Sequence, residues 1–259
     1  MLVLMVIGLQ HLILKESKQN SFNLNLTVGK KYISSALWDS AFDNLIKFSF
    51  KEFTNIESLD NEIGVFLENN DLKKFDYENI KVIHENDLFA LVPNELYSEK
   101  NKEVYLKYNT KIQKNDFIST DDIDMLKIKN VYIPFIDVNN YMVEEFSNIN
   151  YFHFNSLLLK KIFSIRENQE FFSYVNKNKL KIIIFKEDNL QFFNSYNIEN
   201  DSDVIYYILL VLKENKFEIN STLINFIIDS NESELEIISK EFFDKIEVIN
   251  NSDGIDFLM

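Results

Sequence analysis

The stretch FNLNLTVGKKYISSAL, residues 22–37, contains the residue types that phosphate chemistry uses. Its composition is that of a strand, a tight turn and a second strand, with Gly29 at the tip and Lys30 and Lys31 directly after it. A glycine at such a tip either supplies ordinary turn geometry or lets the backbone approach a phosphate. The two lysines would add positive charge there. The residues of this stretch alone do not distinguish the two interpretations.

Three carboxylates lie close together in STDDID, residues 119–124. A helix-loop-helix calcium site needs a glycine at its sixth position and a distant bidentate glutamate. The sequence continues instead with Met125, Leu126 and Lys127. We therefore predict a solvated turn rather than a metal site for Asp121, Asp122 and Asp124.

The remaining candidates for chemistry are more simply structural. His11, His84 and His153 are far apart and lack metal-ligand spacing, and the latter two lie beside predicted strands. Tyr206 and Tyr207 lie among aliphatic residues, which predicts one face of a packed helix rather than a stacking platform. The chain contains no P-loop, GxGxxG or GxSxG motif.

Charge and composition exclude several classes of protein. Asp and Glu number 41 against 27 Lys and Arg, a net charge of −14, which disfavours general nucleic-acid binding. The single arginine, Arg166, leaves few bidentate phosphate contacts. There is no cysteine, hence no disulfide, thiolate nucleophile or zinc ribbon, and a cytoplasmic location is expected.

The first residues, MLVLMVIGLQHLIL, are uncharged but shorter than the roughly 20 apolar residues that span a bilayer. They also lack the basic start and small-residue cleavage site of a signal peptide. We expect residues 1–20 to be an extension outside the fold. Packing onto the domain and a membrane or export role remain alternatives.

Hydrophobic periodicity predicts the elements that would position these residues. Strands are expected at 21–28, 31–38 and 44–51, a helix within 55–72, and strands at 78–86 and 88–93. A helix at 94–109, a strand at 131–135 and helices at 138–147 and 155–168 follow. We predict that this first half ends near residue 150.

The second half, 151–259, repeats the pattern of the first. Three strands within 170–197 precede a helix at 200–216, capped by Asp201 or Ser202, a strand at 221–229, a helix at 232–243 and a strand at 245–249. Phe22 and Phe171 begin the matching units, each of three antiparallel strands, a helix and a further strand. Two such α/β units with mixed sheets covered by helices are the outline of the actin-like, sugar-kinase and heat-shock ATPase fold.

The sequence also resembles a bacterial family. VIHENDLFALVPNELY, VYIPFIDVNNYMVEEF and DVIYYILLVLKENKFEIN resemble the proteins grouped as domain of unknown function 3822, from about Phe22 to Asn250. The resemblance implies a duplicated actin-like ATPase fold and no established activity.

Active members of the actin-like superfamily carry Asp and Gly in the first hairpin of each half, and a glycine pair near the adenosine. Here Thr27 and Val28 precede Gly29 where a carboxylate is wanted, and the second hairpin, YVNKNKL, has neither residue. The third region, IIDSNESE, keeps Asp229 but no glycine. The comparison favours Gly29 as a turn residue with a positive φ.

The sequence thus predicts a non-catalytic actin-like protein, a pseudoenzyme or assembly adaptor that binds an unknown protein partner, with no catalytic, cofactor or metal residues. Exposed aromatics such as Phe152 or Tyr141 would mark the interface. One alternative is a divergent enzyme that binds ATP and Mg²⁺ through Asp229, Asp39 or Asp43 with Lys30 or Lys31. Another is a membrane-proximal scaffold anchored by residues 1–14.

Overall fold

The computed structural model describes residues 21–41, 44–53, 59–108, 110, 112–113, 116–228 and 233–250. The chain divides into two compact units. The first runs to Val92 and includes Tyr97–Asp121 and Asn130–Asn155, and the second holds Pro93–Leu96, Asp122–Lys129 and the chain from Ser156.

The first unit is built on a five-stranded mixed sheet in the order β3-β2-β1-β4-β8. Its strands are β1 (Phe22–Gly29), β2 (Tyr32–Asp39), β3 (Leu45–Glu52), β4 (Tyr77–Glu85) and β8 (Ile149–His153). β1, β2 and β3 are antiparallel neighbours, whereas β4 and β8 run parallel to β1. The three antiparallel strands and the crossover to a parallel strand are those that the sequence predicts.

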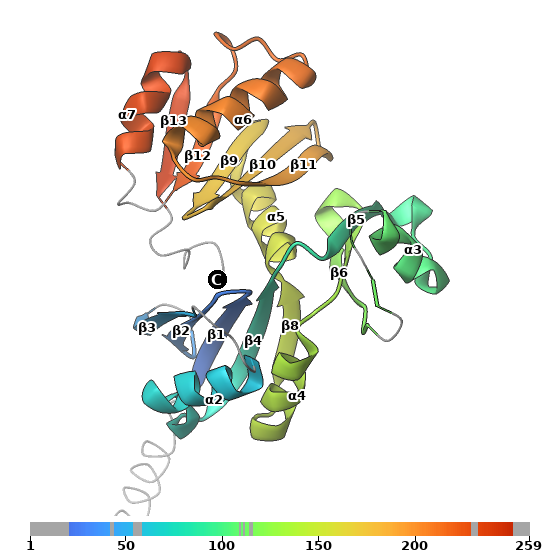
Figure 1. Cartoon of the computed structure of the whole chain (residues 1–259), viewed down its shortest axis with the longest axis vertical. Helices are drawn as coiled ribbons and strands as arrows, with labels where there is room; N and C mark the ends of the chain where they lie inside the picture. The colour runs from blue at the N-terminus through green and yellow to red at the C-terminus, as the bar shows by residue number, and fades with distance from the viewer. Residues whose placement is uncertain are drawn as a thin grey trace, which may run out of the picture. The chain divides into compact units, whose positions relative to one another are not determined.

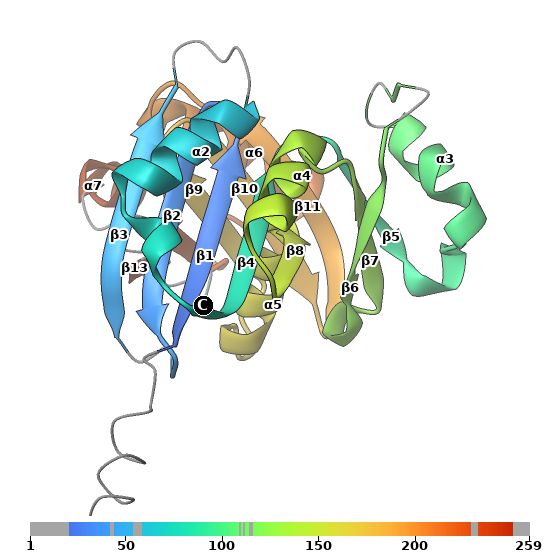
Figure 2. The same cartoon turned by 90° about the horizontal axis from the view of Figure 1, so that it is seen from below.

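Two helices cover one face of this sheet (Figure 2), α2 (Leu59–Asn69) and α4 (Ile136–Glu145). Alternate residues of β1, Leu24, Leu26 and Val28, point into the core that both helices share. The intervening residues, Asn23, Asn25 and Thr27, lie on the other face and are also buried. Strand β1 therefore has an apolar face toward the helices and a polar face opposite.

The second unit repeats this arrangement with the order β11-β10-β9-β12-β13. Its strands are β9 (Phe171–Asn176), β10 (Lys179–Lys186), β11 (Asn189–Asn197), β12 (Ile224–Ile228) and β13 (Ile246–Asn250). The helices α6 (Asp201–Glu214) and α7 (Ser233–Phe242) contribute to one apolar core on the same face of the sheet (Figure 1). The two equivalent strand orders establish an internal duplication.

The cap of α6 lies one residue earlier than the sequence predicts. Asn200, not Asp201 or Ser202, is the N-cap, and its side chain accepts a hydrogen bond from the Asp203 amide at 3.2 Å. The Asp203 carboxylate accepts in return from the Glu199 amide at 2.7 Å. This reciprocal pair satisfies two amide donors at the start of the helix.

Each unit continues beyond its three strands, helix and parallel strand with one further helix and strand, α4-β8 in the first and α7-β13 in the second. The sequence predicts α4, α7 and β13. β8 was not predicted, because its five residues, INYFH, are followed at once by helix α5 (Phe154–Ile165). Since β8 pairs with β4 along its whole length, the first sheet continues past residue 150 to His153.

An insertion between β4 and α4 distinguishes the first repeat from the second. It forms a three-stranded sheet in the order β5-β7-β6, from β5 (Phe89–Pro93), β6 (Ser119–Ile123) and β7 (Ile128–Tyr132). The helix predicted at 94–109 is shorter, with two 3-10 turns before α3 (Lys102–Lys107). At the equivalent place in the second repeat only residues 229–232 separate β12 from α7.

Candidate functional site

The parallel strands β1, β4 and β8 end at one edge of the first sheet. Gly29 at the end of β1 is in register with Glu85 at the end of β4, and His84 of β4 is in register with His153 at the end of β8. Ligands of open α/β sheets bind outside the carboxyl ends of parallel strands. We therefore take this edge, with Lys30 and Lys31 in the β1-β2 turn, as the candidate site.

Gly29 is required here by a close contact and not by its backbone conformation. It is the last residue of β1, and its φ does not lie in the left-handed region. The prediction of a positive φ is therefore wrong. A Cβ at this position would lie 2.5 Å from Cδ1 of Tyr32, and closer still to Cε1, so the tyrosine ring packs directly on the glycine. The Tyr32 hydroxyl donates a hydrogen bond to the Glu85 carboxylate, and its ring stacks on Phe50.

Replacing Gly29 with alanine should destabilise the first unit by about 1–2 kcal/mol, because the added methyl group displaces the Tyr32 ring and its hydrogen bond to Glu85. Urea unfolding of Gly29→Ala, Tyr32→Ala and the double variant measures the effect. In the Tyr32→Ala background the Gly29 substitution should cost almost nothing. Equal costs in both backgrounds would mean that the ring contact is not the reason for the glycine.

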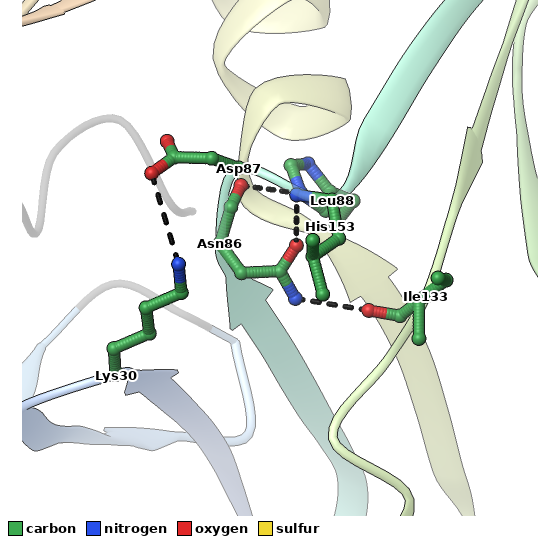
Figure 3. A network of polar contacts seen from close by, with 6 residues as sticks. All are labelled: Lys30, Asn86, Asp87, Leu88, Ile133 and His153. Atoms are coloured by element: carbon green, nitrogen blue, oxygen red, sulfur yellow. Dashed lines mark hydrogen bonds and ion pairs between the residues drawn. The ribbon is translucent and has the colours of Figure 1, made fainter. Parts of the chain in front are cut away.

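The two lysines of the turn have different surroundings. The ammonium of Lys30 lies 4.0 Å from the carboxylate of Asp87, just beyond the end of β4, and both side chains are about half exposed (Figure 3). The backbone carbonyl of Lys31 accepts a hydrogen bond from the Phe53 amide at 2.7 Å, which fixes the turn against the end of β3. An acidic side chain from the segment after β4 thus lies beside Lys30.

A buried polar network supports the segment that carries Asp87 (Figure 3). The Asn86 side chain donates to the Ile133 carbonyl at 2.9 Å and accepts from the Leu88 amide at 2.8 Å. The Asn155 amide donates to Nδ1 of His153, so the Nε2 atom carries the proton and donates to the Asn86 carbonyl at 3.2 Å. The imidazole is fully buried and ties β8 to the end of β4.

Asp121 is a buried member of the same network, so the prediction of a solvated turn at 119–124 is wrong for this residue. It lies in β6, its carboxylate accepts from the His153 amide at 2.7 Å, and the Tyr132 hydroxyl donates to it at 3.2 Å. Burial, together with the adjacent Asp121 charge, raises the pKa of Tyr132, which stays a neutral donor. By contrast, Asp122 is exposed and pairs with Lys129.

His84 is buried among aromatic rings on the same edge. Its Nδ1 atom accepts from the Phe135 amide at 3.3 Å, and the rings of Tyr132, Phe135 and Tyr151 lie 5.8–6.3 Å from its own. Burial lowers the pKa of His84 to about 4, so the ring is neutral at pH 7. Both described histidines therefore serve as neutral packing and hydrogen-bonding groups.

The structure places Asp39, one of the other predicted nucleotide-site residues, away from this edge. Asp39 pairs with Phe22 at the opposite end of the β1-β2 hairpin, roughly 25 Å from Lys30 by the rise of a strand. Its carboxylate accepts from the Asn44 side chain at 2.6 Å, a turn contact. Asp43 and Asp229 lie outside the described residues. Within the described ranges, no three His, Cys, Asp or Glu side chains are grouped as metal ligands.

The hairpin tip of the second unit, unlike that of the first, contains no glycine. Lys177 follows β9 and has a left-handed backbone with φ of 49°, a conformation that costs a residue with a Cβ atom some energy. At the other end of β10 the turn is held by Arg166, whose guanidinium donates to the Glu187 carbonyl at 2.7 Å and to the Asp188 carboxylate at 2.8 Å. The single arginine of the chain is thus a buried structural residue.

The aromatic residues proposed from the sequence as an interface are not exposed. Tyr141 of α4 packs against Gly64 of α2, where an added Cβ would lie 3.1 Å from its hydroxyl oxygen, and Phe152 of β8 is half-buried. Tyr206 is 60% exposed, although it was predicted to pack, whereas Tyr207 stacks on Tyr196 at 4.3 Å. Sequence periodicity places a residue on a helix face but does not show which neighbour covers it.

Comparison with known proteins identifies the family of the chain. A family model described as protein of unknown function, DUF3822, matches residues 11–246. The chain belongs to this family. The match begins upstream of Phe22, so it includes residues that the resemblance seen in the sequence leaves outside. No curated protein matches the chain.

Solved structures identify the fold of this DUF3822 protein. A Bacteroides thetaiotaomicron protein with an actin-like ATPase fold and unknown function superposes with a TM-score of 0.78 at 18% identity, over 93% of this chain and 97% of that one. The protein therefore has the predicted duplicated actin-like ATPase fold. Two weaker likenesses are too distant to bear on function. Ethanolamine utilization protein EutJ from Carboxydothermus hydrogenoformans superposes with a TM-score of 0.47 at 8% identity, over 88% of this chain and 84% of that one. A PilM-PilN type IV pilus biogenesis complex superposes with a TM-score of 0.48 at 9% identity, over 88% of each chain.

Proposed function

We propose that this DUF3822 protein is a non-catalytic member of the actin-like fold that acts by binding another protein. The observation that carries the proposal is the Tyr32 ring on Gly29. Glycine lets a backbone approach a phosphate because it leaves space beside the main chain. Here the chain's own tyrosine fills that space and is held there by Glu85.

The charges around the turn support the same conclusion. The Asp87 and Glu85 carboxylates lie beside Lys30 and Tyr32, so a polyphosphate at this turn would meet two anions. Phosphate sites in proteins concentrate backbone amides and cations instead. The glycine-free turn at Lys177 offers no second phosphate loop.

Binding of a protein is supported by the insertion between β4 and α4. It has a small core of its own around Leu106 and Val131, yet it leaves several large apolar side chains at the surface. Those of the first unit are Val104, Tyr108 and Phe117, of which Tyr108 is 85% exposed. Large exposed apolar side chains on an insertion into a duplicated scaffold are consistent with an interaction surface.

Calorimetric titration of the whole chain with ATP and Mg²⁺, repeated with ADP, tests the non-catalytic half of the proposal. We expect no binding heat at millimolar nucleotide. Micromolar binding that is lost in Lys30→Ala or Lys31→Ala would overturn it and would favour the divergent ATP-binding enzyme. Tyr32→Ala is a useful further variant, because weak binding that appears only without the ring would support its role in closing the site.

Affinity capture from cell extract tests the binding half. Proteins recovered with the wild type should be lost with the double variant Val104→Ser/Tyr108→Ser and retained with Tyr206→Ser, a matched exposed tyrosine of the second unit. Equal recovery with all three would exclude the insertion as the interface. In the described residues, no helix has the length and apolarity needed to cross a membrane. The proposed tether, residues 1–14, lies outside those residues.

A further inference from the structure

The edge strand β3 carries an unusual concentration of exposed apolar side chains. Leu45, Ile46 and Phe50 are 40%, 52% and 42% exposed. In the sheet order β3 has β2 on one side, and within the described part of the chain no strand follows on the other. An eight-residue edge of this kind is a template for pairing with another strand.

The residues of β3 divide cleanly between the two faces of the sheet. Lys47 donates to the Asn70 carbonyl at 2.7 Å and Lys51 pairs with Glu62 of α2 at 2.6 Å, so both lysines lie on the helix-covered face. Phe48 and Phe50 are in register with Ala36 and Ser34 on the opposite face. The two lysines of this edge strand are therefore turned toward α2, and the other face carries Phe48 and Phe50, followed by Glu52 at the end of the strand.

We propose that β3 pairs antiparallel with β3 of a second copy of this chain, about a two-fold axis at Phe48. In such a pair, residues that face α2 in one copy must lie opposite residues that face α2 in the other. A shift of one residue would set the apolar side chains against the helix-covered face. In the register centred on Phe48, Ile46 lies opposite Phe50 of the second copy and Lys47 lies opposite Ser49. Apolar pairs then meet on one face and no like charges meet on the other.

The neighbouring registers are electrostatically worse. Centring the axis on Lys47 sets two lysines directly opposite each other, and centring it on Ser49 sets Lys47 opposite Lys51. Like charges directly across a strand pair destabilise it. Leu37 pairs with Lys47 and Trp38 with Leu45, so β3 bulges at Ile46 and its regular part begins at Lys47. The core of the pairing is therefore Lys47–Ser49 with its mate, and Ile46 and Phe50 flank it.

Single cysteines test the register, because the chain contains no cysteine of its own. Directly opposite residues lie about 4.5–5.5 Å apart between Cα atoms, within reach of a disulfide. Under mild oxidation Phe48→Cys should therefore give mainly covalent dimer. Ile46→Cys or Phe50→Cys alone should not form a covalent dimer, since each cysteine lies roughly 13 Å from the same cysteine in the second copy. A mixture of the two variants should cross-link. Equal cross-linking of all three variants would indicate random collision and overturn the proposal.

Sedimentation equilibrium of the unmodified chain provides the second measurement. We expect a monomer–dimer equilibrium that strengthens with salt, because each copy carries a net charge of −14. Ile46→Lys should shift it to monomer, whereas Val143→Lys, at a similarly exposed apolar residue of α4, should not. A wild type that is monomeric at high concentration, with Phe48→Cys failing to cross-link, would refute the dimer and leave the proposed non-catalytic role untouched.

Discussion

Asp121→Ala should lower the free energy of unfolding by about 3 kcal/mol, a large share of the stability of an average domain. The carboxylate is buried and accepts from the His153 amide and the Tyr132 hydroxyl. Truncation leaves both donors without this acceptor in a region that excludes water, and each such group costs about 1–3 kcal/mol. The loss also loosens the contact of β6 with the end of β8.

Chemical denaturation monitored by circular dichroism measures this effect, and Asp122→Ala is its matched control. Asp122 is the next residue of β6, but it is exposed and pairs with Lys129, an interaction worth at most about 1 kcal/mol. Asp121→Asn keeps one acceptor oxygen and should fall between the two. If Asp121→Ala is no more destabilising than Asp122→Ala, the buried network does not stabilise this edge of the sheet.

The sequence predicts those parts of the fold whose signals are local. Alternation in β1 sets Leu24, Leu26 and Val28 on the core face, and this pattern survives intact in the structure. The same local signals, repeated from Phe171 onward, predict the duplication. Hairpins, amphipathic helices and the crossover rule together were therefore enough for the fold class.

The parts that the sequence does not predict depend on contacts between distant segments. Asp121 looks like a solvated residue within STDDID and is buried only because Tyr132 and His153 approach it from two other strands. Gly29 looks like a turn glycine, and its actual constraint is the ring of Tyr32. No local pattern distinguishes these alternatives, since each is decided by which side chain fills the neighbouring space.

The buried ring of His84 should make stability depend on pH. Its pKa is about 4 in the folded protein, against an ordinary value of 6.5, and the cause is burial, which disfavours the charged imidazolium. Between these two pH values the unfolded chain binds a proton at His84 that the folded chain does not. The contribution of His84 to the free energy of unfolding is therefore fully present above about pH 6.5. It is lost as the pH falls toward 4, by about 3 kcal/mol in all.

The contribution of His84 is isolated by comparing the wild type with His84→Leu, which cannot titrate. Carboxylates also protonate in this range, so the informative quantity is the difference between the two stability curves. That difference should be flat above pH 6.5 and change by about 1.4 kcal/mol per pH unit near pH 5. NMR titration of the imidazole gives the folded pKa directly. A value near 6.5, or parallel curves for the two proteins, would mean that protons reach and charge the ring, and that the aromatic residues around His84 do not exclude water from it.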